Sequence, residues 1–181
     1  MVNSICYVTG RYGVLESGLG EYLATLADEM FGVSLSRELM AESPLYQVAA
    51  VAGALDRAEA KRAPVIANSY GAYLTLQAMI GRGTLRTKVL LLSPVLGRIV
   101  TPTRISIPPL AKRLEQALES GECAAKWLEM HIGEEDEGFD AEQFATVSRK
   151  LKSNLAVTYP GEGHSMTKNQ VATISQAFFW S

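Results

Sequence analysis

The chain contains 181 residues, of which 48 % are hydrophobic and 20 % are charged, and its formal net charge is −2. This length and balance predict a single globular domain over residues 1–181, large enough to bury most of its apolar surface. Nucleic acid and anionic membranes are poor candidates as partners because no Lys/Arg cluster is present, and no apolar run is long enough for a membrane span.

The amino-terminal segment and the cysteine content indicate a cellular compartment. The first residues have neither a basic region nor a long apolar run, so they do not resemble a secretion signal. The two cysteines, Cys6 and Cys123, lie far apart in the sequence, and two cysteines with two histidines do not make a convincing metal site. We therefore expect a cytoplasmic protein that needs no metal or organic cofactor.

The amino-terminal part of the chain alternates strand and helix signals. The β-branched and aromatic run at residues 4–8 predicts a buried strand. Ser17 is placed to cap a helix over residues 18–30, and Gly32 fits the end of that helix. A brief second strand is expected at residues 33–35.

The rest of the chain continues this alternation. Ser43 followed by Pro44 is a helix start, and that helix is expected to reach Arg62. Further strands are expected at residues 64–67, 88–92, 124–132 and 154–159, and further helices at residues 70–80, 110–120 and 140–151 and from Thr167 to Trp180. The segment at residues 95–109 is irregular but apolar, so it is expected to pack over a neighbouring part of the fold.

The predicted strands are mostly continuous apolar runs separated by helices. This pattern predicts a three-layer α/β sandwich, in which a mostly parallel sheet of about six strands is covered by helices on both faces. In such sheets the chemistry lies at the carboxyl ends of the strands. The loops at residues 10–13, 133–140 and 161–164 and the serines Ser69 and Ser93 all follow predicted strands, so they should meet at that edge.

The segment Ala67-Asn68-Ser69-Tyr70-Gly71 lies where a predicted strand turns directly into a predicted helix. Small residues two before and two after a serine are typical of a nucleophile elbow, usually written G-x-S-x-G. Such a turn strains the serine backbone, lifts the hydroxyl clear of the sheet and directs N–H groups of the helix N-terminus at the same point. The alternative is an ordinary strand–loop–helix junction with a capping serine.

A serine nucleophile needs a general base and a carboxylate that orients that base. His131 falls within a predicted strand and is expected to be a core or sheet-edge residue, whereas His164 lies in a glycine-rich loop after a strand and is the predicted base. Asp136, three residues past the strand end, is the predicted carboxylate, and Glu134 is the second choice. Asp140 is better explained as a helix cap.

The chain order Ser69, Asp136, His164 is the one that the α/β-hydrolase fold uses. The segments ANSYGAYL, HIGEEDEGFD and YPGEGHSM resemble the elbow, the acid loop and the histidine loop of compact serine hydrolases of the retinoblastoma-binding-protein type. The resemblance covers nearly the whole chain. It implies an α/β-hydrolase-like sandwich with a minimal lid and a Ser-His-Asp triad.

The resemblance also implies an oxyanion hole made of two backbone N–H groups. One would belong to Tyr70 and the other to Gly10, Arg11 or Tyr12, in the turn after the first strand. The usual His-Gly pair of that turn is replaced by Thr9-Gly10 here, which leaves the second donor open. The turn matches neither the dinucleotide-binding nor the P-loop pattern, which argues against a nucleotide site.

The apolar segment at residues 95–110 is the only part left to roof the site. Five of its residues are candidates for an acyl pocket, although core packing would use the same residues: Val95, Leu96, Ile99, Val100 and Ile105. Arg11, beside the proposed site, could bind a substrate carboxylate or could simply be solvated.

Together these residues predict a serine hydrolase that cleaves a carboxylic ester or related acyl bond of a small molecule through an acyl-enzyme. Two alternatives remain open. The first is a binding or scaffold protein that keeps the hydrolase fold without turnover. The second is a thioesterase or peptidase with the same triad, because the pocket rather than the triad chooses the leaving group.

Overall fold

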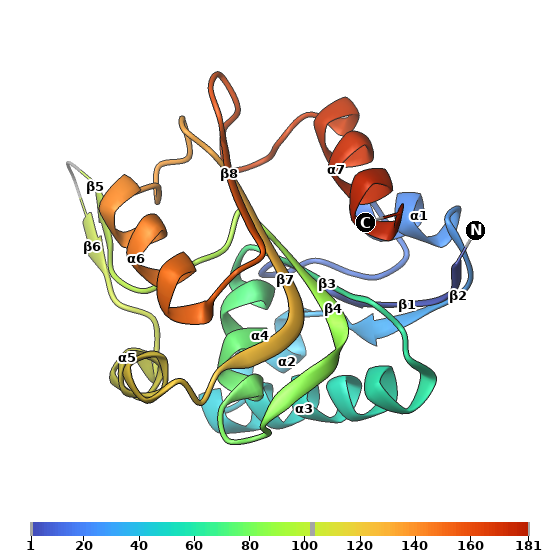
Figure 1. Ribbon diagram of the computed structural model, residues 1–181, viewed down its shortest axis with the longest axis horizontal. Coiled ribbons are helices and arrows are strands. Elements are labelled where there is room, and N and C mark those ends of the chain that lie inside the picture. The colour runs from blue at the N-terminus through green and yellow to red at the C-terminus, as the bar shows by residue number, and fades with distance from the viewer. Residues whose placement is uncertain (1, 102–103, 181) are drawn as a thin grey trace.

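Figure 1 shows the computed structural model of the chain, which describes residues 2–101 and 104–180. Within these residues the main sheet has six strands in the order β2-β1-β3-β4-β7-β8, and all neighbouring strands are parallel. The strands are β1 (Val2–Val8), β2 (Ala27–Val33), β3 (Val65–Asn68), β4 (Thr84–Leu92), β7 (Ala124–Gly133) and β8 (Leu155–Tyr159). The predicted parallel sheet is confirmed.

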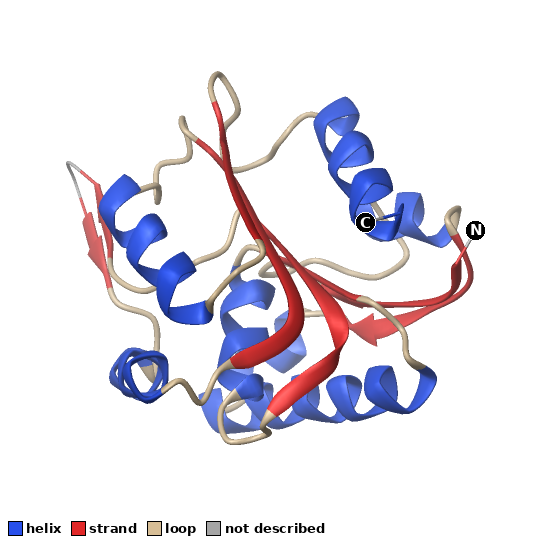
Figure 2. Cartoon of the chain, viewed as in Figure 1, coloured by secondary structure: helices blue, strands red, loops and turns tan. Residues whose placement is uncertain are grey.

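Helices cover both faces of this sheet, as Figure 2 shows. One face carries α3 (Pro44–Lys61), α4 (Tyr70–Met79), α5 (Ala111–Ser120) and α6 (Ala141–Leu151), and the other carries α1 (Leu19–Ala24) and α7 (Lys168–Trp180). The core is correspondingly divided by the sheet. Val51 and Tyr73 belong to the first layer, whereas Leu23 and Phe178 belong to the second, and all four are buried.

Successive strands are added on opposite sides of β1. The second strand pairs with one side of β1 and the third strand pairs with the other side. The loops that follow β1 and β3 therefore leave the same sheet edge next to each other, which is where parallel sheets form a crevice. This topology brings the turn after β1 beside Ser69, which directly follows β3.

The predicted helix over residues 18–30 is wrong in its second half. The helix α1 ends at Ala24, and β2 begins at Ala27 and pairs with β1. Charged Glu29 suits a helix surface, but here it is a half-buried residue of a strand, and its carboxylate binds side chains of α3. Gly32 lies within β2 rather than at a helix end, and Gly18 takes the N-cap position expected of Ser17.

Helix caps elsewhere follow the predictions. Ser43 Oγ accepts a hydrogen bond from the Tyr46 N–H at 3.3 Å at the start of α3, and that helix ends at Arg62 in a left-handed conformation with φ of 54°. At the start of α6 the Asp140 carboxylate accepts from the Gln143 N–H at 2.8 Å. These caps satisfy backbone groups that a helix end leaves without partners.

The apolar segment that follows β4 contains an antiparallel hairpin of β5 (Ile99–Thr101) and β6 (Arg104–Ser106), which the sequence did not predict. The end of this segment is fastened to α4. The Tyr73 hydroxyl donates to the Pro109 carbonyl at 2.6 Å, and Gln77 Nε2 donates to the Leu110 carbonyl at 2.9 Å.

A short helix, α2 (Arg37–Ala41), was also not predicted. Among the described residues, no helix has the length and apolar character needed to cross a bilayer.

Candidate active site

Ser69 stands alone between the end of β3 and the start of α4. Its backbone has φ of 55° and ψ of −122°, a positive-φ conformation that is strained for any residue with a side chain. Ala67 is completely buried, so the turn accommodates its methyl group where glycine is more usual. Gly71 packs against the backbone of Thr9. The segment thus has the local shape that the elbow pattern predicts.

A chain of hydrogen bonds joins Ser69, His164 and Asp136. Ser69 Oγ lies 2.8 Å from His164 Nε2, and His164 Nδ1 lies 2.7 Å from Asp136 Oδ2. An ionised carboxylate only accepts, so Nδ1–H donates to Asp136 and leaves Nε2 to accept from the serine hydroxyl. The other oxygen of Asp136 accepts from the Gly138 N–H at 2.8 Å. This arrangement can take a proton from the hydroxyl.

The three side chains differ in their access to water. Asp136 is buried, whereas 45 % of the His164 side chain is exposed. The hydrogen bond to Asp136 raises the pKa of His164 above its ordinary value, and partial burial opposes this effect. The buried carboxylate therefore favours the protonated imidazole, which is the form that would appear after proton transfer from Ser69.

The other candidate side chains are engaged elsewhere. His131 is buried in β7, as predicted, and its nitrogens lie 2.8 Å from the Tyr159 hydroxyl and 3.2 Å from Glu129 Oε2. Burial lowers the pKa of His131, so the neutral imidazole is favoured. Glu134, the second choice for the acid, accepts a hydrogen bond from Thr158 Oγ1 at 2.7 Å.

The turn after β1 offers fewer backbone donors than the sequence predicted. The Tyr12 N–H donates to the Leu35 carbonyl at 2.8 Å, so it is removed from the set of possible oxyanion donors. Gly10 and Arg11 remain, because within the described residues neither of their N–H groups has a hydrogen-bond acceptor. Gly10 is close to the elbow, since a Cβ on it would lie 3.3 Å from Ser69 Cβ.

Thr9 holds this turn in place. Its side chain is buried, and Oγ1 accepts a hydrogen bond from the Leu35 N–H at 2.8 Å. The same hydroxyl lies 3.1 Å from the carbonyl oxygens of Gly10 and Gly13 and can donate to either. Thr9, which stands where a histidine is usual, therefore holds the turn in place through its hydroxyl.

A cavity of about 520 Å³ opens above Ser69. Its polar part includes Ser69, His164 and Arg11, together with Glu137, which directly follows the predicted acid Asp136. Its apolar part includes Val95, Ile99, Ile107, Pro108 and Pro109. Its size is within the range of small-molecule sites in proteins.

The predicted pocket residues fall into three groups. Val95 and Ile99 line the cavity, and the side chain of Val100 lies outside the described part of the structure. Leu96 is a correction, because it is buried and lines a smaller cavity between α5 and α6. Ile105 is another, because side chains alternate along a strand: Ser106 lines the cavity, so Ile105 points away and is 59 % exposed.

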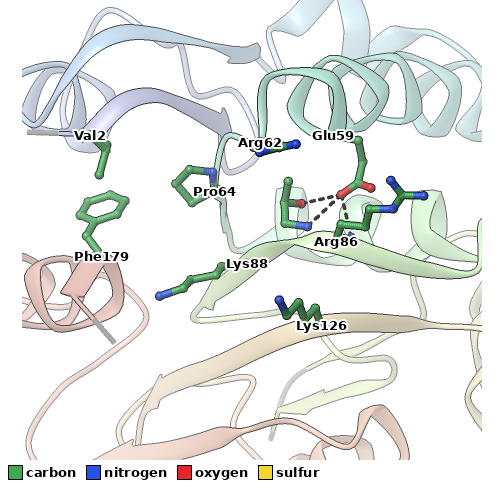
Figure 3. Close-up of a pocket in the computed structure, with 9 residues that line it drawn as sticks. Val2, Glu59, Arg62, Pro64, Arg86, Lys88, Lys126 and Phe179 are labelled. Carbon is green, nitrogen blue, oxygen red and sulfur yellow. Dashed lines mark hydrogen bonds between the residues drawn. The ribbon is translucent and has the colours of Figure 1, made fainter.

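A second cavity, of about 550 Å³, lies toward the amino-terminal ends of the strands (Figure 3). It is lined by Pro64, Lys88, Lys126 and Phe179 among others, and none of its lining residues is a serine, cysteine or histidine. In the part of the chain that the structure describes, no group of three or more His, Cys, Asp or Glu side chains is placed to hold a metal ion. The cavity above Ser69 is therefore the candidate active site.

No protein-family model matches the sequence, and no curated protein matches it. Solved structures do match. Est1E from Butyrivibrio proteoclasticus aligns with a TM-score of 0.66 and 13 % identity over 98 % of this chain and 85 % of its own. The monoacylglycerol lipase of Paleococcus ferrophilus aligns with a TM-score of 0.68 and 14 % identity over 98 % of this chain and 93 % of its own.

A structure from a study of two metagenome-derived lipolytic enzymes, LipS and LipT, gives the same TM-score and identity, and covers 98 % of this chain and 92 % of its own. Identities this low show the fold alone. Together with the sheet order and the helices on both faces, these matches show that the chain has the α/β-hydrolase fold.

Proposed function

We propose that this protein is a serine hydrolase that cleaves a carboxylic ester or a related acyl bond of a small molecule. Ser69 is the nucleophile, His164 is the general base and acid, and Asp136 orients the imidazole. The observation that carries the proposal is the continuous hydrogen-bonded chain from Asp136 through His164 to Ser69, at the carboxyl edge of a parallel sheet and beneath an open cavity.

In the first half of the reaction, Ser69 Oγ attacks the acyl carbon and its proton passes to His164 Nε2. When the bond between the acyl carbon and the leaving oxygen breaks, that proton passes to the leaving group, and the acyl group stays on Ser69. A water molecule then gives a proton to His164 and attacks the acyl carbon, which releases the acid and restores the serine hydroxyl. Side chains and backbone N–H groups are sufficient for this chemistry.

The tetrahedral intermediates carry a negative oxygen that needs donors. The Tyr70 N–H, at the first position of α4, is one proposed donor, and the N–H of Gly10 or Arg11 is the other. Two such donors are each worth about 3–4 kcal/mol of transition-state stabilisation. Because Gly10 lies close to Ser69, the turn after β1 is near enough to share this role.

The similar structures support an ester as substrate. They include a monoacylglycerol lipase, a structure from the study of the lipolytic enzymes LipS and LipT, and Est1E with bound ferulic acid. The apolar wall of the cavity, with Val95, Ile99 and Ile107, suits an acyl chain or an aromatic group. The same triad would serve a thioesterase or peptidase, so we propose the ester on the basis of these neighbours.

A fluorophosphonate probe tests the proposal. We expect a covalent adduct on Ser69, found by mass spectrometry of the labelled peptide, and none in Ser69→Ala or after heat denaturation. The 4-nitrophenyl esters of acids of increasing chain length then measure turnover, which Ser69→Ala should lower by about 10⁶-fold. A well-folded wild-type protein that forms no adduct and hydrolyses no ester would be a binding protein rather than an enzyme.

A further inference from the structure

The Arg11 side chain lines the same cavity as Ser69. The guanidinium carbon of Arg11 lies 4.7 Å from the centre of the Tyr70 ring, and both residues line the cavity above Ser69. Tyr70 directly follows Ser69 in the chain. Arg11 thus reaches the cavity from the turn after β1, which also carries one of the two proposed oxyanion donors.

The ring beneath this cation is held by other side chains. Tyr70 stacks on Tyr73 with ring centres 5.6 Å apart and planes inclined by 21°. The Tyr73 hydroxyl donates to the Pro109 carbonyl at 2.6 Å and accepts from Gln77 Nε2 at 2.9 Å. Because Tyr73 is fixed in this way, Tyr70 gives the flat guanidinium a preformed surface to stack on, which reduces the entropy that Arg11 loses when it binds a ligand.

The charge of Arg11 is not neutralised by the protein. Among the described residues, no carboxylate forms an ion pair with it. Two carboxylates line the same cavity, but Asp136 is bound to His164 and to the Gly138 N–H. Glu137 is exposed on the loop after β7, and it is not paired with Arg11 in an ion pair.

We propose that Arg11 binds a carboxylate of the substrate, so that this site prefers esters that carry a carboxylate group. The inference rests on the proposed function, since it concerns the same cavity. A guanidinium donates two parallel hydrogen bonds to a carboxylate, which a lysine ammonium cannot reproduce. The apolar wall with Ile99 and Ile107 then receives the carbon chain that links the carboxylate to the ester.

The test compares pairs of esters that differ in charge but hardly in shape. Mono-4-nitrophenyl adipate carries a carboxylate on the acyl side, and methyl 4-nitrophenyl adipate is its neutral counterpart. In the second pair, 4-acetoxybenzoate carries the carboxylate on the alcohol side, and its methyl ester is the neutral counterpart. We expect wild-type kcat/KM to favour the charged member of at least one pair by about tenfold, once spontaneous hydrolysis is subtracted. Arg11→Gln should abolish most of that ratio, and Arg11→Lys should give an intermediate value.

A matched control removes the same charge outside the cavity. Arg37 is exposed on α2 and does not line the cavity, so Arg37→Gln should leave the ratio unchanged. Three outcomes would overturn the role of Arg11 and leave the proposed hydrolase standing. They are an equal fall in kcat/KM for both members of a pair in Arg11→Gln, an equal change of the ratio in Arg37→Gln, and a wild-type protein with no charge preference. No hydrolysis of any of the four esters, without a fluorophosphonate adduct, would overturn both proposals.

Discussion

A Cβ atom on Gly71 would lie 2.1 Å from the backbone oxygen of Thr9. The first turn of α4 and the end of β1 therefore meet backbone to backbone, with no side chain between them. This contact sets the distance between the Tyr70 N–H on one side and the turn with Gly10 and Arg11 on the other. Glycine two residues after the serine is thus a steric requirement of the elbow.

Gly71→Ala should lower the free energy of unfolding by about 1–3 kcal/mol, because the backbone must shift to accept a methyl group. It should also lower kcat, since the shift separates the proposed oxyanion donors. Urea denaturation and ester turnover measure the two effects. Gly53→Ala is the control: Gly53 lies in α3 with open space around it, so alanine should stabilise the protein by about 0.5–1 kcal/mol. A Gly71→Ala protein as stable as the wild type would contradict the contact.

Asp136→Asn should lower kcat by about 10⁴-fold. An amide does not hold the imidazole in the tautomer that leaves Nε2 free to accept from Ser69, and it does not stabilise the imidazolium. Steady-state kinetics with a 4-nitrophenyl ester measure the loss. Glu134→Gln is the matched control, because this neighbouring carboxylate binds Thr158 and should change kcat by less than about twofold. A loss below tenfold in Asp136→Asn would remove Asp136 from the mechanism.

The acid limb of the kcat/KM profile should have its midpoint above pH 6.5, the ordinary value for an imidazole. The pKa of His164 is raised by its hydrogen bond to Asp136, and only the unprotonated ring can accept the serine proton. Activity should therefore rise with pH through that raised pKa. In Asp136→Asn the midpoint should move to lower pH, because the anionic partner is gone. An unchanged midpoint in this variant would assign the limb to another group.

Protonation of His131 should destabilise the folded protein as the pH falls. Burial lowers the folded-state pKa of His131 below its unfolded value, so the unfolded chain binds the proton first, and stability is lost as the pH falls through about 6.5. His164 has the opposite sign, but it is present in both proteins when wild type is compared with His131→Gln. Urea denaturation from pH 7.5 to 5 should show a smaller decline for His131→Gln. Parallel declines would contradict this prediction.

The parts of the fold that depend on local signals could be predicted. The strands of the sheet centre are continuous apolar runs, and the caps at Ser43 and Asp140 each need only neighbouring residues. The positions of Ser69, Asp136 and His164 could be inferred for a related reason. Each follows a strand, and a parallel sheet brings the carboxyl ends of its strands to one edge.

The parts that were missed depend on contacts between distant residues. The chain at residues 27–30 is a strand because β1 offers a pairing partner, which overrides the helical pattern. The hairpin of β5 and β6 has strands of three residues each, too short for an alternation pattern to be recognised. Tyr12 could not be excluded as an oxyanion donor because its acceptor, Leu35, lies on another strand-end loop.

A threonine hydroxyl fastens the turn at the end of β1, at the position where the resemblance leads one to expect the histidine of a His-Gly pair. Thr9 ties that turn to the backbone of Leu35 without any ionisable group. The conformation of this turn should therefore not change as the pH falls. The pH dependence of the site should then come from His164. A sequence pattern that requires histidine at this position would exclude this chain. A pattern that also allows a small hydroxyl residue before the glycine would include it.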